Sequence, residues 1–301
     1  MDERPDNNNS SRILIIVILL ACAAAFLVAG YKLSHSLMEY EAGNVEYGKV
    51  SEKYVKVREK GTAVRTVVSE EAEEEEEESP WTEDQSIPDM TVDYDALKAE
   101  NPDYSCWLYL PATGISYPVV RGEDNDFYLH HTFEKEKNVN GCIYIDSRSW
   151  TDLMDYNTYI FGHNMRNGSM FGSLKQMLND PSIAVSDPWF YLIMRDEVWK
   201  YHIYSLHVTP PNSSYFHNPA TKAEYADYIE MALKDSVADM EEEVTTDDKT
   251  MTLSTCSGTG AGKKRLVVHG KLAGIIKTDG SGSVSYNYAK PAIQTENSEN
   301  K

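Results

Sequence analysis

The apolar residues of this chain are concentrated first in a single run near the N-terminus. The run covers residues 13–29 without interruption, and with Gly30 and Tyr31 it reaches 19 residues. As a helix it would be roughly 28 Å long, about the thickness of a bilayer core. We predict a transmembrane signal anchor at residues 13–31. A cleaved secretory signal and a lipoprotein signal ending at Cys22 are the alternatives, but the run continues well past Cys22 and is longer than a typical signal-peptide core.

From residue 90 onward the pattern changes to short strand-like runs separated by turn residues. One of them, VWKYHIYSLHV, is rich in aromatic and β-branched residues, as strands are. Many short strands at irregular spacing predict a mainly β fold, either a barrel or a sandwich. The predicted strands are 106–110, 115–120, 141–145, 158–161, 198–208, 250–255 and 266–272.

Helices are predicted at three places in the same region. Apolar residues at helical spacing predict a helix over residues 169–178 and a longer one over 222–240. Thr221 and Glu224 form a capping box at the start of the longer helix. A short helix is predicted over residues 94–100, with Asp93 as its N-cap.

Two polar segments lie on either side of this region. Residues 32–89 are predicted to be a stalk, in which residues 70–78 contain eight Glu and one Ala. Like charges at this density repel, so we expect an extended, solvated spacer, with a calcium- or partner-binding patch as the alternative. Residues 278–301 contain too little apolar surface to offset the entropy of ordering, and they are predicted to be a disordered tail.

The charge of the chain excludes some functions. Its formal net charge is −20, and residues 1–89 contribute half of this excess. Sequence-independent binding to nucleic acid or to anionic lipid needs clustered Lys and Arg, which this balance disfavours. Four cysteines in a chain of 301 residues do not form a disulfide scaffold.

The cysteines differ in their surroundings. Cys106 and Cys142 lie inside apolar strand patterns, where a thiol usually acts as a small buried hydrophobe, and a disulfide between them is the alternative. Cys256 ends the run TMTLST and precedes a Gly-rich turn, so it is accessible yet held by a rigid element. Arg265 follows at the start of the next strand and can return beside Cys256. A permanent cation there can stabilise a thiolate and a developing oxyanion.

One histidine has a comparable position. His163 lies in YIFGHNMRNGSMF, where an apolar strand stops at Gly162 and the chain turns before a helix. A histidine at a strand end can reach a neighbouring strand end, and its ordinary pKa suits proton transfer near neutral pH. His202 and His207 fall within a predicted strand and are interpreted as structural.

Several blocks of this sequence together resemble the sortases, and their class B branch is the best match. The resemblance covers about residues 90–277. The most specific blocks are residues 159–165 (YIFGHNM), 252–256 (TLSTC) and 265–269 (RLVVH), and further agreement comes from residues 117–120 (YPVV) and 125–131 (NDFYLHH).

The resemblance implies a fold and a location. Sortases have an eight-stranded β-barrel, and class B members add an N-terminal helical part and a long helix before the nucleophile strand, which residues 222–240 match. The family is found mainly in Gram-positive bacteria, with the catalytic domain outside the cell membrane. It therefore implies a single-pass protein with residues 1–12 in the cytoplasm, an anchor at 13–31, a stalk at 32–89 and an extracellular catalytic domain at 90–277.

The resemblance also implies the chemistry of a cysteine transpeptidase, with no cofactor and no metal. Matching the motifs makes Cys256 the nucleophile, His163 the acid–base residue and Arg265 the cation beside the oxyanion. Ser254, Thr255 and Asn164 are weaker candidates for substrate binding, while Gly258 stands where some class B relatives carry an acidic residue.

The expected partners are secreted proteins with a C-terminal sorting signal, cleaved after a Thr, and an amine acceptor from peptidoglycan. Three other functions remain open from the sequence. The chain could polymerise pilins by using a Lys acceptor, hydrolyse its thioester with water, or bind a ligand without catalysis. The presence of Cys256, His163 and Arg265 together argues against the last of these.

Overall fold

The computed structural model describes residues 7–57, 88, 90–211, 213–256 and 264–278. The Glu-rich run, Gly258 and nearly all of the predicted tail lie outside the described residues.

Eight strands close into a mixed β-barrel in the order β10-β8-β7-β3-β4-β5-β6-β9. This confirms the predicted eight-stranded barrel. Strands β4 and β5 pair in parallel, as do β6 and β9, and the other neighbours are antiparallel. The strands are β3 Tyr104–Leu110, β4 Ile115–Val120, β5 Ile143–Ile145, β6 Asn157–Phe161, β7 Trp189–Ile193, β8 Glu197–Thr209, β9 Thr250–Cys256 and β10 Arg265–Lys277.

The two longest strands, β8 and β10, pair along most of their length, and their register shifts between His269 and Gly270 and between Leu272 and Gly274. Gly270 lies where a Cβ atom would come 2.2 Å from the ring of Phe190, so no larger residue fits there without moving that ring. The sequence analysis did not predict β7, whose run WFYLI follows directly on the turn at Asp187 and Pro188.

Helix α6 (Lys222–Asp235) covers the outer face of β8, β9 and β10. It begins as predicted, because the side chain of Thr221 accepts a hydrogen bond from the backbone N–H of Glu224. Its predicted end at residue 240 was wrong. After Asp235 the chain becomes extended, and the N–H of Val237 donates to the Leu206 carbonyl of β8 at 2.9 Å. A hydrogen bond to the sheet edge thus replaces the next helical turn.

The helix predicted over residues 169–178 is a 3₁₀ turn, η2 (Phe171–Leu174), followed by α4 (Lys175–Asn179). It starts later than predicted because Met170 has a φ of 53°, which is incompatible with a right-handed helix. Helices α3 (Phe127–His130) and α5 (Ser182–Ser186) and the turns η1 (Pro111–Thr113) and η3 (Ser214–Phe216) lie between strands.

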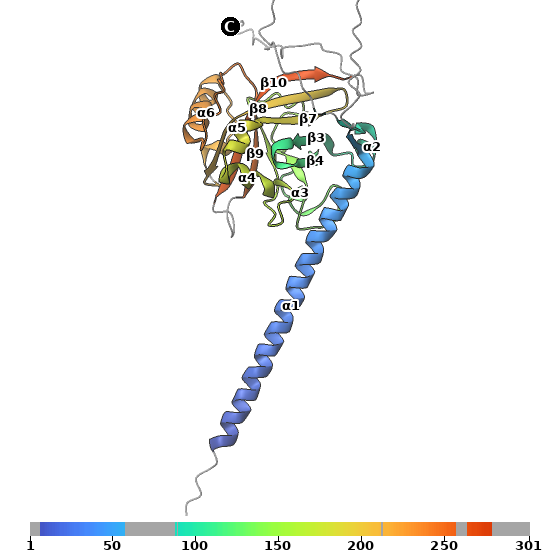
Figure 1. Cartoon of the computed structure of the whole chain (residues 1–301), viewed down its shortest axis with the longest axis vertical. Helices are drawn as coiled ribbons and strands as arrows, with labels where there is room; N and C mark the ends of the chain where they lie inside the picture. The colour runs from blue at the N-terminus through green and yellow to red at the C-terminus, as the bar shows by residue number, and fades with distance from the viewer. Residues whose placement is uncertain (1–6, 58–87, 89, 212, 257–263, 279–301) are drawn as a thin grey trace, which may run out of the picture.

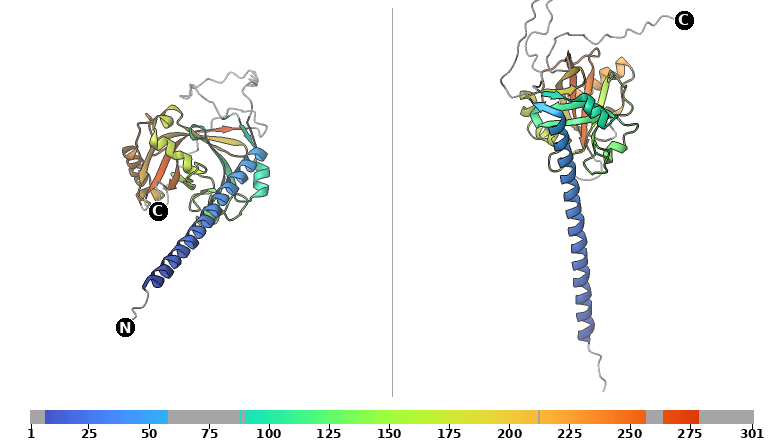
Figure 2. Two further views of the ribbon diagram at one scale, coloured as in Figure 1. Left: turned by 60° about the horizontal axis from the view of Figure 1, so that its bottom comes forward. Right: turned by 90° about the vertical axis from the view of Figure 1, so that its right-hand side faces the viewer.

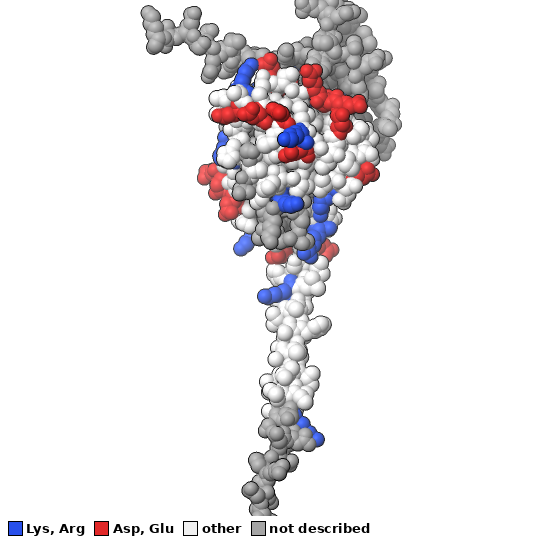
Figure 3. Space-filling model, turned by 90° about the vertical axis from the view of Figure 1, so that its left-hand side faces the viewer, with Lys and Arg blue, Asp and Glu red and all other residues white. Residues whose placement is uncertain are grey.

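Helix α1 (Asn7–Tyr54) is one continuous helix of 48 residues. Figures 1 and 2 show it leaving the barrel as a long shaft on the side away from α6. Its apolar stretch is exposed, and Figure 3 shows this part of the shaft almost free of charged side chains. Among the described residues, it is the one helix long and apolar enough to cross a membrane, which is compatible with an anchor.

The C-terminal part of α1 packs on the barrel. Tyr47, Val50 and Tyr54 are buried in the main core. Strand β1 (Val55–Val57) continues from the helix and pairs antiparallel with β2 (Met90–Val92), which leads into α2 (Tyr94–Glu100). The packed structure therefore includes residues 39–57, which lie within the segment that the sequence analysis assigned to a stalk.

Candidate active site

Cys256 is the last residue of β9, Arg265 is the first residue of β10, and the two are direct partners across the antiparallel pair. A guanidinium N–H of Arg265 donates to the sulfur of Cys256. The thiol is neither fully buried nor fully exposed. The turn between the strands lies outside the described residues, but the strand register alone brings the cation to the thiol.

His163 reaches the same end of the barrel from β6. Strands β6 and β9 run in parallel with Phe161 opposite Ser254, so two further residues bring His163 level with Cys256. The amide nitrogen of Asn164 donates to the Cys256 carbonyl at 2.5 Å, which ties the two strand ends together. Gly162 is required by close packing, since a Cβ atom there would lie 2.7 Å from the ring of Phe171.

The imidazole of His163 is held by a backbone carbonyl. Its Nε2 lies 2.7 Å from the carbonyl oxygen of Leu129. A carbonyl can only accept, so Nε2 carries the hydrogen and Nδ1 is the nitrogen left to take up or give a proton. Burial lowers the pKa of His163, the hydrogen bond to Leu129 opposes this shift, and the charge of Arg265 adds to it. The resting imidazole is therefore neutral at pH 7.

The weaker candidates fall on different sides of β9. Ser254 shares the outward face with Cys256, because side chains alternate along a strand, and its buried hydroxyl has no hydrogen-bond partner among the described residues. Thr255 lies on the opposite face with Leu253 and is also buried without a partner within this part of the chain. The structure thus brings Asn164 and Ser254 to the site and turns Thr255 into the barrel.

Sequence reasoning missed two contributors. The Leu129 carbonyl is a backbone atom, which no side-chain pattern identifies. Tyr144 on β5 pairs with Phe161, and burial raises its pKa to about 12 while the charge of Arg265 opposes the shift. Its signal was its place in the strand-like run GCIYID, two residues after Cys142.

The other cysteines do not join the site. Cys106 and Cys142 are both buried free thiols, so the alternative of a disulfide between them is not realised. Burial raises the pKa of each to about 12, which keeps them protonated. No group of His, Cys, Asp or Glu in the described part of the chain is arranged to hold a metal ion.

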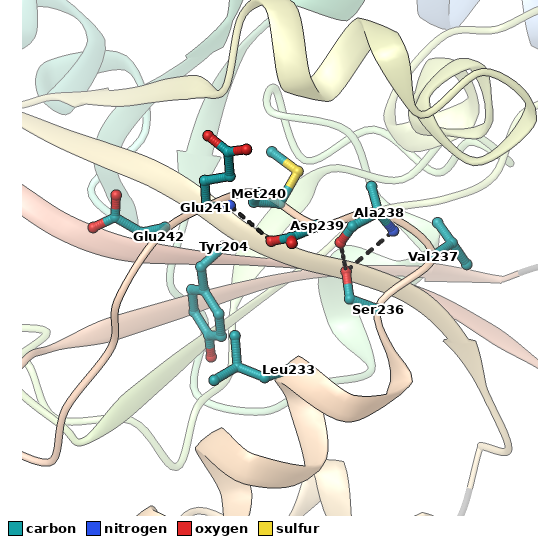
Figure 4. A pocket seen from close by; sticks show the side chains of 9 residues that line it. All are labelled: Tyr204, Leu233, Ser236, Val237, Ala238, Asp239, Met240, Glu241 and Glu242. Atoms are coloured by element: carbon teal, nitrogen blue, oxygen red, sulfur yellow. Dashed lines mark hydrogen bonds between the residues drawn. The ribbon is translucent and has the colours of Figure 1, made fainter.

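A pocket of about 390 Å³ lies elsewhere, beside the loop that follows α6. Figure 4 shows Leu233 and Val237 at its side and the acidic residues Asp239, Glu241 and Glu242 around it. None of the candidate site residues lines this pocket, so it is separate from the Cys256 end of the barrel.

Comparison with known proteins agrees with this geometry. Residues 108–273 match the family model of the sortase domain. The chain therefore belongs to the sortase family and is a cysteine transpeptidase by membership.

The relatives identify the branch as class B. Sortase B of Listeria monocytogenes is 35% identical over 179 residues, which cover 58% of this chain and 72% of the relative. The crystal structure of Clostridium perfringens sortase B matches with a TM-score of 0.55 and 32% identity, covering 59% of this chain and 97% of that one. A crystal structure of sortase B from B. anthracis matches with a TM-score of 0.60 and 28% identity, covering 78% and 98%.

Proposed function

We propose that this chain is a membrane-anchored class B sortase that cleaves a C-terminal sorting signal of secreted proteins after a Thr and transfers the acyl group to an amine of peptidoglycan. The observation that carries the proposal is the contact between Arg265 and Cys256 at paired strand ends, with His163 beside them. Thiol, cation and imidazole then have the roles that the sequence motifs suggested.

In the first stage, Nδ1 of the neutral His163 imidazole takes the proton of the Cys256 thiol. The resulting thiolate attacks the Thr carbonyl carbon and a carbon–sulfur bond forms. Arg265 stabilises the negative charge that develops on the carbonyl oxygen. His163, in its protonated form, gives the proton on Nδ1 to the leaving amine as the carbon–nitrogen bond breaks. A thioester on Cys256 and a neutral imidazole remain.

In the second stage, an acceptor amine attacks the thioester and passes a proton to Nδ1 of His163. The carbon–sulfur bond breaks and Cys256 leaves as a thiolate, and return of the proton from Nδ1 to the sulfur restores the resting thiol and neutral imidazole. Dividing the transfer through a thioester replaces one difficult step with two easier ones. The Leu129 carbonyl keeps Nε2 protonated in both stages, so a single nitrogen handles the moving proton.

The location follows from α1. Residues 13–31 form the anchor, residues 1–12 remain in the cytoplasm and the barrel lies outside the cell, where secreted substrates and peptidoglycan are available. Support comes from the exposed apolar side chains of this stretch, such as Leu20 at 65% and Phe26 at 79% exposure, which water disfavours but a bilayer core accommodates.

The test uses the full chain in detergent with a panel of sorting peptides, each with and without candidate amines. Cys256→Ala and His163→Ala should abolish transpeptidation, whereas Cys106→Ala, which removes a buried thiol, should retain it. Cleavage that persists in Cys256→Ala contradicts the proposal. Product formation independent of any amine would favour a hydrolase, and a preference for a pilin Lys would favour a polymerase.

A further inference from the structure

The packed part of α1 lies against the loop of residues 138–142. Asn138 Nδ2 donates to the Glu39 carbonyl at 3.0 Å, and Asn140 Nδ2 lies 3.4 Å from the Tyr40 carbonyl. The contact is close, since a Cβ atom on Gly43 would come 2.3 Å from Asn140 Nδ2. The helix therefore holds this loop through several hydrogen bonds and a fitted surface.

Tyr47 is the most deeply placed contact between α1 and this loop. Its side chain is 5% exposed, and its hydroxyl donates to the Gly141 carbonyl at 2.5 Å. Burial raises the pKa of Tyr47 well above its ordinary value, so the hydroxyl keeps its hydrogen. Gly141 is thus fixed from the helix side by a buried donor.

Gly141 also lies close to the candidate acid–base residue. It has a φ of 55°, and a Cβ atom there would lie 3.1 Å from His163 Cδ2 and 2.8 Å from the Leu129 carbonyl oxygen. That carbonyl is the one that accepts from His163 Nε2. A shift of Gly141 would therefore disturb both the ring of His163 and the acceptor that fixes its tautomer.

A second route leads from Tyr47 to the turn that follows His163. The Tyr47 ring packs edge-on against Tyr117, with centroids 5.4 Å apart at 84°. The Tyr117 hydroxyl accepts from the N–H of Met170 at 3.1 Å, and Met170 forms a β-bridge with Asn164. Asn164 in turn donates to the Cys256 carbonyl. One side chain of α1 therefore supports the turn around His163 from both sides.

We propose that Tyr47 is a positioning residue for His163, and that the N-terminal helix supports the candidate active site through this one side chain. The inference rests on the proposed function, since it assigns Tyr47 a role only if His163 is the acid–base residue. Without the Tyr47 hydroxyl, the buried Gly141 carbonyl loses its donor and the loop shifts. The Leu129 carbonyl then holds Nε2 less firmly, and both tautomers of His163 become populated.

The test compares Tyr47→Phe with Tyr54→Phe in the full chain. Tyr54 is a matched control because it is a buried tyrosine on the same helix, and its hydroxyl donates to Glu100, away from the His163 loop. Because small errors in the placement of a reacting group are costly, Tyr47→Phe should lower kcat roughly tenfold with KM unchanged. Tyr54→Phe should leave kcat within about twofold of the unaltered chain, since it moves no group near the reaction.

A spectroscopic measurement distinguishes positioning from general loosening. Nitrogen NMR of histidine-labelled protein should show His163 as a single tautomer with hydrogen on Nε2, and a mixture in Tyr47→Phe only. An unchanged kcat with a single tautomer in Tyr47→Phe would overturn the inference, and so would an equal loss in both variants. His163→Ala in the same assay tests the proposed function separately, because activity in that variant would refute the role of His163 whatever Tyr47→Phe does.

Discussion

Strands β9 and β10 present one outward face with two very different ends. At one end Cys256 pairs with Arg265, and toward the other end Thr252 pairs with His269. The first pair is only partly buried, whereas the second lies beneath α6 and is fully buried. Both ends contain a histidine nearby, so residue type alone does not distinguish a reactive end from a structural one.

The covered end contains a network of hydrogen bonds centred on Thr252. The hydroxyl of Thr252 lies 2.9 Å from His269 Nδ1, 2.8 Å from the Tyr228 hydroxyl and 2.9 Å from Asn157 Oδ1. Burial lowers the pKa of His269 well below its ordinary value and lowers that of His207, stacked against it, to about 4. Both rings are therefore neutral and contribute to packing.

The comparison teaches that the surroundings of a histidine matter more than its burial or an unpartnered ring nitrogen, since the buried Nε2 of His269 also has no partner among the described residues. Burial lowers the pKa of His163 as well, yet its Nδ1 is not engaged by the Leu129 contact and its loop is tied to Cys256. In His269 the Nδ1 atom already has two hydroxyl partners. The open end can therefore exchange a proton, and the covered end is expected to contribute only stability.

The largest expected effect is a loss of catalytic rate when the cation at the Cys256 end is removed, compared with a cation near the covered end. Arg265→Met should lower kcat/KM by about 10²–10³-fold, because it removes the donor beside the oxyanion, while leaving the thermal midpoint unchanged. Lys271→Met is the matched control, since it removes a cation from β10 near the covered end. Steady-state kinetics with a sorting peptide checks both variants. Equal losses of activity would show that the position of the cation is irrelevant.

Acid should affect the covered end selectively. The folded-state pKa of His207 lies below its unfolded value, so its contribution to the free energy of unfolding is complete above about pH 6.5 and declines as the pH falls toward 4. For a shift of this size the loss is about 3 kcal/mol. Urea unfolding at several pH values measures it. His207→Phe should show a shallower decline, and an identical decline would contradict the assignment.

Removing one hydroxyl from the network should lower stability without stopping the reaction. Thr252→Val removes one hydrogen bond from each of three buried polar groups and should reduce the free energy of unfolding by about 1–3 kcal/mol. Thr255→Val, three residues along the same strand, should be nearly neutral, because that hydroxyl has no partner within the described residues. Urea titration compares the two. A similar cost in both would mean that the network adds nothing.

The smallest effect concerns the helix that covers the network. Thr221→Ala removes the N-cap of α6 and should lower the free energy of unfolding by about 1 kcal/mol, with kcat unchanged. Thermal unfolding followed by circular dichroism measures the loss. Thr221→Ser keeps a capping hydroxyl and should restore the midpoint. A fall in kcat that accompanies the cap deletion would show that α6 also shapes the reactive end.

Much of the reactive end could be predicted because its signals are local. The strand-like run TMTLST, the short connection and the first position of the next run were enough to expect Arg265 beside Cys256, and the register confirms that they lie side by side. The position of His163 after Gly162 indicated a strand end. The ends of β6 and β9 meet because the two strands pair in parallel. Such pairing depends on how the whole barrel closes, so the local sequence could not predict it.

The contacts that were missed join residues distant in sequence. Tyr47 meets Gly141, 94 residues away, and Leu129 acts through a backbone carbonyl that every residue possesses. The helical pattern of α1 gave no clear packing face, since its apolar residues occur on all sides in the anchor stretch. The early end of α6 likewise depends on the edge of β8, which is formed elsewhere in the chain.

The continuity of α1 has a consequence for how the barrel is presented. From Tyr31 to Glu39 the helix advances by eight residues and rises only about 12 Å, without a break that could act as a hinge. If residues 13–31 cross the membrane as proposed, the continuous helix α1 fixes how far the Cys256 end of the barrel lies above the lipid surface. It also fixes the direction in which that end faces around the helix axis. Adding one residue to this stretch would rotate the barrel by about 100° around the helix axis. The length of the segment between the membrane and the barrel therefore determines the orientation of the site.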